Sequence, residues 1–139
     1  MIYRCINNDE ALAPDVLYHG YRHPSYVDNT LTIGRSYVVY GMSLYNDDLK
    51  YLIRNDSGHA RWKAPYFFKE VDSRLPPYWE FRAFDQTGLT GFSRRTFQAI
   101  WGYPILVRHP EHNSGLIDIV PYDMEVFAEE IERRAAYDL

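Results

Sequence analysis

Four strand-like segments joined by tight turns fill residues 31–72, and this stretch limits the fold more than any other part of the chain. Residues 36–44 alternate two sets of side chains and are rich in β-branched and aromatic residues, which is typical of a strand. The turns at 46–48 and 55–58 use Asn, Asp and Gly, which tolerate a left-handed backbone. Further strands are predicted at 49–54, 60–63 and 67–71, with Pro65 marking a turn. Such a meander can curl into a small antiparallel barrel.

The segments on either side of the meander predict two more strands. Residues 2–6 form a short apolar run that can pair with the meander, and residues 78–84 alternate again after the stiff Pro76-Pro77 turn. Residues 9–30 have no persistent period and contain Pro14, Gly20 and Pro24, so they predict a long loop with at most one helical turn near residues 10–12.

A different pattern begins near Ser93. Phe97, Ile100 and Trp101 fall on one helical face, and Gly102 and Pro104 then predict the end of a helix. The short β-branched runs 105–107 and 116–120 predict a late hairpin. Residues 123–136 predict an amphipathic helix. Its apolar stripe consists of Met124, Phe127, Ile131 and Ala135. The expected fold is therefore α+β, with a small SH3-like antiparallel β-barrel at 1–84 and a helix-containing extension at 85–139 packed on it.

Composition and charge narrow the class of protein. The chain has 139 residues, 46% of them hydrophobic, which is enough for one domain with a core. The net charge is −4, and the six acids and two arginines of residues 121–139 account for all of it. A nucleic-acid-binding protein usually shows clustered basic residues instead. The thirteen tyrosines suit either a partner-binding surface or ordinary β-formation.

No catalytic motif or cofactor motif is present, so neither an enzyme nor a cofactor is expected. The single cysteine, Cys5, excludes an internal disulfide and lies in an apolar segment, where an inert buried thiol is expected. His19 and His23 are separated by Gly20, and His109 and His112 have no nearby cysteine, so no metal site is expected. The chain has no membrane-length apolar run and no signal-peptide pattern, which predicts a cytoplasmic location.

Several sequence patterns resemble a known group of proteins. CINN at residues 5–8, LTIGRSY at 31–37 and YLIRNDSG at 51–58 resemble small phage and bacterial proteins with an SH3-like barrel. WKAPYFFKEVD at 62–72 resembles a related group with a helical C-terminal extension, associated with bacterial toxin-immunity loci. The chain departs from the pattern in its longer 9–30 insertion and in having Arg35 in place of a lysine. The resemblance implies a barrel fold and, by analogy, an immunity function.

Two functions follow from these observations. The first is a non-catalytic, acidic immunity protein that neutralises a cationic bacterial toxin domain by direct binding. The alternative is a nucleic-acid-binding SH3-like protein of phage origin, with Trp62 as an aromatic platform flanked by basic residues. These residues are Arg35, Arg54, Arg61 and Lys63. The candidate partner-binding residues lie on the final helix and are Glu125, Glu129, Glu132, Tyr122 and Tyr137. Trp62 and Phe68 are expected to be mostly buried in the barrel.

Overall fold

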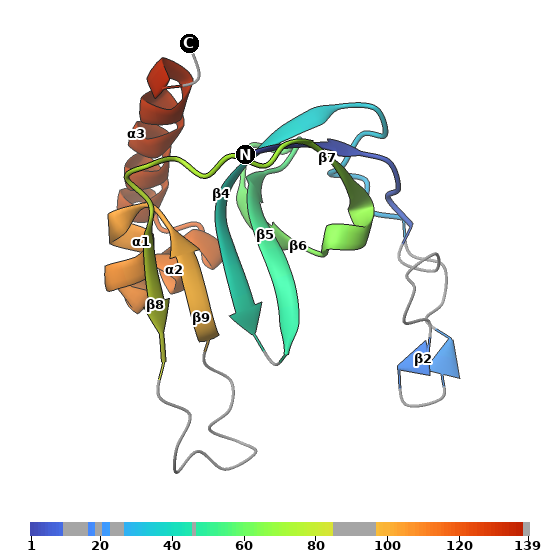
Figure 1. Ribbon diagram of the computed structural model, residues 1–139, viewed down its shortest axis with the longest axis horizontal. Coiled ribbons are helices and arrows are strands. Elements are labelled where there is room, and N and C mark those ends of the chain that lie inside the picture. The colour runs from blue at the N-terminus through green and yellow to red at the C-terminus, as the bar shows by residue number, and fades with distance from the viewer. Residues whose placement is uncertain (10–16, 19–20, 23–26, 46, 85–96, 138–139) are drawn as a thin grey trace.

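The protein is an α+β protein with a mostly antiparallel seven-stranded sheet and three C-terminal helices (Figure 1). The computed structural model describes residues 1–9, 17–18, 21–22, 27–45, 47–84 and 97–137. The elements are β1 (Ile2–Cys5), β2 (Leu17–Tyr18), β3 (Tyr21–Arg22), β4 (Ser36–Tyr45), β5 (Asp48–Arg54), β6 (Ala60–Lys63), the 3₁₀ helix η2 (Pro65–Phe67), β7 (Phe68–Asp72), β8 (Glu80–Ala83), β9 (Phe97–Gly102), α1 (Pro104–Arg108), α2 (Pro110–Ile117) and α3 (Pro121–Tyr137).

The long strand β4 holds the sheet together. It pairs with β5 on one side, and on the other side it pairs first with β1, from Ser36 to Val38, and then with β9, from Gly41 to Tyr45. The sheet therefore forks into two wings, one of β1 and β7 and the other of β9 and β8. Figure 1 shows β8 and β9 beside the helices and β7 on the far side of β4.

The meander predicted from the sequence is present. The strands expected at 2–6, 36–44, 49–54, 60–63 and 67–71 correspond to β1, β4, β5, β6 and β7 within one or two residues. At the turns, Asp47 and Gly58 have φ angles of 66° and 82°, in the left-handed region that the sequence predicted. The strand expected at 78–84 is present as the shorter β8. The sheet is not closed, because the strand order runs from β6 at one edge to β7 at the other, and η2 connects these two strands.

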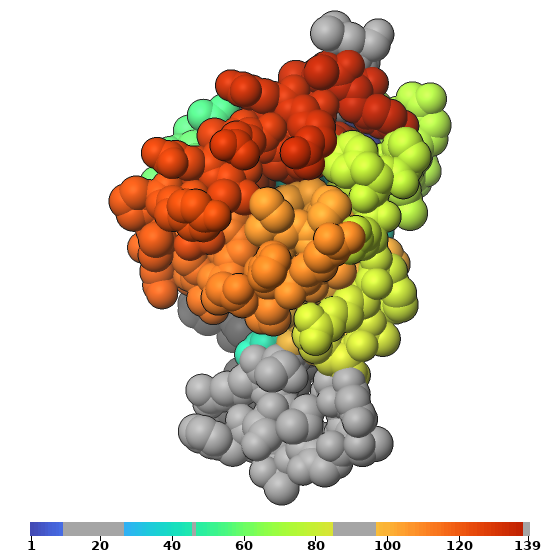
Figure 2. Space-filling model, turned by 90° about the vertical axis from the view of Figure 1, so that its left-hand side faces the viewer, coloured from blue at the N-terminus to red at the C-terminus, as the bar shows by residue number. Residues whose placement is uncertain are grey.

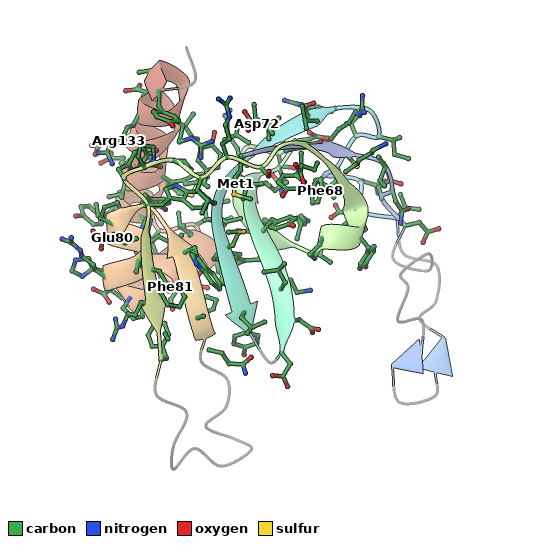
Figure 3. The ribbon with its side chains drawn as sticks, viewed as in Figure 1. Met1, Phe68, Asp72, Glu80, Phe81 and Arg133 are labelled. Atoms are coloured by element: carbon green, nitrogen blue, oxygen red, sulfur yellow. The ribbon has the colours of Figure 1, made fainter. Side chains whose placement is uncertain are left out.

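Two hydrophobic clusters lie on opposite sides of β4. The first contains Met1, Val39, Ile53 and Phe68 and is enclosed by β1, η2 and β7. The second joins the sheet to the helices, and its buried members are Tyr40, Leu52, Ala60, Ile100, Tyr103, Leu106, Val107, Leu116 and Phe127. In Figure 3, Met1 and Phe68 lie on the β7 side, whereas Arg133 marks α3 on the opposite side.

The prediction of a helix ending at Gly102 was wrong for the residues described, because Phe97–Gly102 is the strand β9. Ile100 is buried under the helices, while Trp101 faces the other way and packs on Phe81 of β8 with ring centroids 4.7 Å apart. Both faces of the strand are therefore apolar, which hides the two-residue period. Residues 85–96, including Ser93, lie outside the described residues.

The predicted late hairpin was also wrong, because residues 105–107 lie in α1 and residues 116–120 form the end of α2 and the turn after it. Pro104 and Pro110 stand at the first positions of these helices, where proline is well tolerated because no hydrogen bond from its nitrogen is needed. Leu106 of α1 is buried against Gly41 and Gly102, which are register partners on β4 and β9. A Cβ at either glycine would lie less than 3 Å from Leu106 Cδ2. Tertiary packing of this kind overrides the β-propensity of residues 105–107.

Phe68 is buried, as predicted, with 8% of its surface exposed. Trp62 is only partly buried, and it packs on the second cluster under the helices instead of inside the first cluster. The helix predicted at 123–136 is confirmed as α3. Of its predicted stripe, Phe127 is buried and Met124 and Ile131 are partly buried, but Ala135 is exposed.

Within the 9–30 segment, β2 and β3 pair with each other, and Asp9 forms a bridge with Val27. The helical turn predicted near residues 10–12, and His19 and His23, lie outside the described residues. The division of the chain at residue 84 stays a prediction.

Candidate functional site

The helix α3 is held to the sheet by charged residues as well as apolar ones. Glu130 and Arg134 are 2% and 1% exposed, on the same side of the helix as Phe127. Arg134 Nη1 donates to the backbone oxygen of Val39 at 2.8 Å, and the Tyr78 hydroxyl donates to Glu130 Oε1 at 2.5 Å. The sequence pattern missed this set, because a period of 3.6 residues by itself assigns charged residues to the solvent side.

Burial changes the ionisation of this buried set. Burial raises the pKa of Glu130, although the Tyr78 hydrogen bond and the nearby arginines 133 and 134 oppose the change. Burial and the hydrogen bond to Glu130 likewise raise the pKa of Tyr78. Arg133 Nη1 donates to Glu130 Oε2 at 3.0 Å, so the carboxylate is shared between a tyrosine and an arginine.

The opposite side of α3 presents the acids predicted as a contact surface. Glu125, Glu129 and Glu132 are all exposed, and at 3.6 residues per turn they fall within about 60° of one another around the helix axis. Among the described residues, none of the three is recorded in an ion pair. Figure 2 shows the helical side of the molecule, with α3 running along its upper edge above α2. We call these three carboxylates the acidic face of α3.

The two predicted tyrosines have different positions. Tyr122 is 71% exposed and lies next to the acidic face by helical geometry. Tyr137 is 49% exposed but falls toward the buried side of the helix, where its ring packs on Tyr78 at a centroid distance of 6.2 Å. The structure therefore brings four of the five predicted residues together and separates Tyr137 from them.

A chain of hydrogen bonds under the helices has the residue types of a catalytic relay. His112 Nε2 lies 2.6 Å from the Tyr103 hydroxyl, and His112 Nδ1 lies 2.7 Å from Asp123 Oδ1. Tyr103 and His112 are only 1% and 2% exposed, so a substrate cannot reach them in this conformation. Asp123 approaches closely because a Cβ at Gly115 would lie 1.8 Å from Asp123 Oδ2. These hydrogen bonds link α2 to α3 and to the segment before α1, so the three residues hold the helices together.

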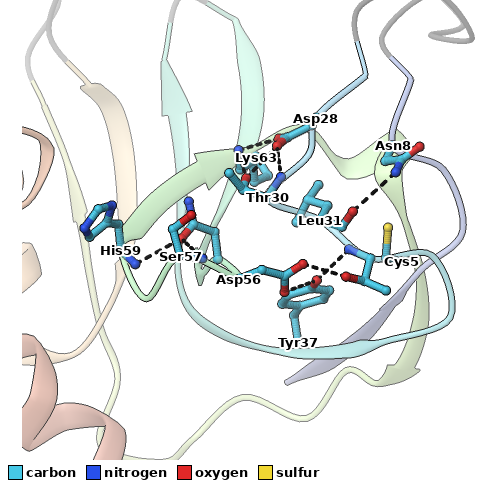
Figure 4. A network of polar contacts seen from close by, with 12 residues as sticks. Cys5, Asn8, Asp28, Thr30, Leu31, Tyr37, Asp56, Ser57, His59 and Lys63 are labelled. Atoms are coloured by element: carbon cyan, nitrogen blue, oxygen red, sulfur yellow. Dashed lines mark hydrogen bonds and ion pairs between the residues drawn. The ribbon is translucent and has the colours of Figure 1, made fainter.

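The residues that carry the sequence resemblance meet in one polar network (Figure 4). Asp56 accepts hydrogen bonds from Thr32 Oγ1 at 2.6 Å and from the Tyr37 hydroxyl at 2.7 Å, and it forms an ion pair with Arg35 at 2.9 Å. Burial alone would raise the pKa of Asp56, but these hydrogen bonds and the charge of Arg35 lower it below its ordinary value. The network connects the segment before β4 to the β5–β6 turn.

The same network fixes the turn itself and the end of the 9–30 segment. Asn55 Oδ1 accepts from the backbone nitrogens of Ser57 and His59, both at 3.0 Å. Asp28 pairs with Lys63 Nζ at 2.5 Å, and Asp28 is 8% exposed. Burial opposes the ionisation of Asp28, but hydrogen bonds from Lys63 and Thr30 lower its pKa. These contacts hold the β5–β6 turn, the segment before β4 and the end of the 9–30 segment in place, and none of them by itself indicates a ligand.

The basic residues proposed for nucleic-acid binding are largely engaged within the protein. Arg35 pairs with Asp56, Lys63 pairs with Asp28, and Arg61 Nη1 donates to the Leu116 oxygen at 3.2 Å. The Trp62 indole is not an exposed platform, because it packs under α2 and Nε1 donates to Asn113 Oδ1 at 2.6 Å.

Sequence reasoning also missed a cavity of about 520 Å³ between α2 and the sheet. It is lined by Ser43, Tyr45, Lys50, Trp62, Phe84, Phe97, Pro110, Asn113, Ser114 and Ile117. These residues come from well-separated parts of the chain, so no local pattern could have indicated it.

Among the residues that the structure describes, no group of three or more His, Cys, Asp or Glu side chains could hold a metal ion. Cys5 is buried, and burial raises the pKa of its thiol. No helix in the described part of the chain combines the length and the apolar character needed to cross a membrane.

The fold and the site define an α+β protein whose last helix presents an acidic face. No protein-family model matches the chain, and no significant match was found among curated proteins or solved structures.

Proposed function

We propose that this chain is a non-catalytic protein-binding module, and specifically an immunity protein that neutralises a cationic toxin domain by direct binding. The observation that carries the proposal is the acidic face of α3. Its three carboxylates are exposed on one side of a helix whose other side is anchored by Phe127, Glu130 and Arg134. A rigid, negatively charged surface accelerates the encounter with a positively charged partner.

The fold of the N-terminal part belongs to the same proposal. We take β1, β4, β5, β6, η2 and β7 as an open form of an SH3-like barrel. The antiparallel meander β4–β5–β6 and the return of β7 beside β1 support this assignment. The resemblance at residues 5–8, 31–37 and 51–58 supports it too. Residues 31–37 contact Asp56, and Asn8 and Cys5 are hydrogen-bonded to the backbone of Leu31 and Arg35.

The test replaces the three acids Glu125, Glu129 and Glu132 together by lysine and measures association with the toxin domain encoded beside this chain's gene. Folding should be unchanged by circular dichroism, because the side chains are exposed. The association rate should fall, and its dependence on salt concentration should become flatter.

A matched control separates the acidic face from net charge. Lysine replacements at Asp48, Glu70 and Glu111 change the total charge equally, and these acids are exposed on β5, β7 and α2. The control should slow association much less than the α3 variant. Equal rates for the two triple variants would show that the α3 face is only a solvated helix surface.

The proposal also predicts weak contact with nucleic acid. At physiological salt and low micromolar protein, neither single-stranded nor double-stranded DNA or RNA should be shifted in an electrophoretic assay. A shift that added salt weakens steeply would instead favour the nucleic-acid-binding alternative.

A further inference from the structure

The cavity between α2 and the sheet has the features of a binding site for a small molecule. Its volume of about 520 Å³ falls in the range of small-ligand pockets. One wall is formed by Pro110, Asn113, Ser114 and Ile117 of α2, and the other walls come from β4, β5, β6, β9 and Phe84.

Aromatic side chains form the body of the cavity and hold one another in place. The ring centroid of Phe97 lies 5.7 Å from that of Trp62 and 5.8 Å from that of Tyr45. The Trp62 indole is fixed by its hydrogen bond to Asn113. The walls are thus preorganised for a flat apolar group, which reduces the entropy lost on binding.

The sheet side of the cavity carries a buried polar group. Ser43 is 1% exposed and lines the cavity, and its Oγ has no hydrogen-bond partner among the residues described. A buried hydroxyl group without a partner is unfavourable, so a native structure that keeps one usually supplies a partner from elsewhere.

A lysine lies opposite Ser43 on the neighbouring strand. Lys50 on β5 is the register partner of Ser43 on β4, and directly opposed residues project to the same side of a sheet. Lys50 also lines the cavity and is recorded in no ion pair within the described part of the chain. A hydroxyl donor next to an ammonium group is suited to a carboxylate.

We propose that this cavity binds a small molecule with one carboxylate and an apolar, aromatic body. The carboxylate accepts hydrogen bonds from Ser43 Oγ and Lys50 Nζ, and the ring packs against the aromatic wall formed by Trp62 and Phe97. This site is independent of the acidic face of α3, because the cavity lies between α2 and the sheet and none of the three carboxylates lines it.

The test compares two probes with the same apolar body, 4-phenylbutyrate with a carboxylate and 4-phenylbutyramide with a neutral amide. Binding is followed by calorimetry and by the indole NH resonance of Trp62 in a proton–nitrogen correlation spectrum, assigned with Trp62→Phe. The carboxylate should bind at least tenfold more tightly than the amide, and both should shift the Trp62 resonance.

Lys50→Met should abolish the preference for the carboxylate while leaving the amide affinity unchanged. Lys69→Met, an exposed lysine on β7, is the matched control and should preserve the preference.

A second variant tests the location of the site. Ser114→Trp places a large side chain into the cavity from the exposed surface of α2, and it should abolish binding of both probes while the circular dichroism spectrum is unchanged. The proposal is overturned if neither probe shifts Trp62 at millimolar concentration. It is also overturned if the two probes bind equally, or if Lys50→Met leaves their ratio unchanged.

Discussion

The residues that carry the sequence resemblance and the residues under the helices are stabilised by polar contacts of different range. In the first region, residues 1–9 and 27–72, many of the contacts are local turn contacts, such as those of Asn55 with Ser57 and His59. In the second region, residues 78–84 and 97–137, Tyr78 contacts Glu130 across 52 positions and Arg134 contacts Val39 across 95. We call these the motif region and the helical region. The motif region thus combines local turn contacts with longer ones, such as Lys63 with Asp28 across 35 positions, whereas the helical region is joined to the rest of the fold by long-range contacts.

The largest expected effect tests whether the two regions unfold together. Phe68→Ala and Phe127→Ala each remove a buried ring, one from each hydrophobic cluster, and each should cost about 3–5 kcal/mol. Because β4 supplies Val39 to one cluster and Tyr40 to the other, both variants should still unfold in one transition. Urea unfolding followed by circular dichroism and by tryptophan fluorescence measures this.

The control is Phe81→Ala on the outer strand β8, where the side chain is 55% exposed (Figure 3). It should cost at most about 1 kcal/mol, in the range usual for exposed positions. If Phe127→Ala melted the helices while the fluorescence and strand signals persisted, the helical region would be a separate folding unit.

The difference between the regions explains what the sequence could predict. The β5–β6 turn was predictable because Asn55 bonds to the backbone of its own turn and Gly58 allows a positive φ. The helices α1 and α2 were not, because α1 depends on Leu106 fitting against Gly41, which is 65 positions earlier in the chain. The strand β9 was mistaken for a helix because apolar residues occupy both of its faces.

In the candidate site, too, some features could be predicted from the sequence and others depend on distant residues. The exposure of Glu125, Glu129 and Glu132 follows from the amphipathic period of a single helix, so sequence alone was sufficient to indicate it. Burial of Glu130 and Arg134 depends on Tyr78 and Val39, which no period within the helix can reveal. The cavity beside Ser43 requires four strands, Phe84 and a helix to come together, and its residues carry no local pattern.

The second prediction uses pH, because carboxylates in the two regions have pKa values shifted in opposite directions. The pKa of Asp56 is lowered, so its contribution to stability is present above about pH 3.8 and is lost as the pH falls further. Asp56→Asn should cost about 1–3 kcal/mol at neutral pH by leaving its donors poorly paired. This cost should shrink as the pH falls below 3.8.

In the helical region, the contribution of the buried carboxylate to stability changes with pH in the opposite direction. The pKa of Glu130 is raised above 4.5, so its contribution is present below pH 4.5 and is lost as the pH rises through the raised pKa. Relative to the wild type, Glu130→Gln should therefore become more stable as the pH rises. Urea unfolding between pH 3 and 7 measures both slopes. If the stability of Asp56→Asn and of Glu130→Gln, each relative to the wild type, changed with pH in the same direction, the contrast between the regions would be contradicted.

The smallest expected effect concerns the backbone of the turn before α3. Ile119 has a φ of 57°, a left-handed conformation that β-branched residues rarely adopt, whereas the motif region places Gly58 at a φ of 82°. Ile119→Gly removes this strain, which is worth about 1–2 kcal/mol, but it loses some backbone entropy and the contacts of a side chain that is 42% exposed. We therefore expect a net gain of up to about 1 kcal/mol in the free energy of unfolding.

The reciprocal change, Gly58→Ala, should cost about 1–2 kcal/mol because it introduces the same strain. Thermal unfolding of both variants at neutral pH gives the comparison. A destabilised Ile119→Gly variant would mean that the packing of the Ile119 side chain, and not the turn conformation, decides how α2 passes into α3.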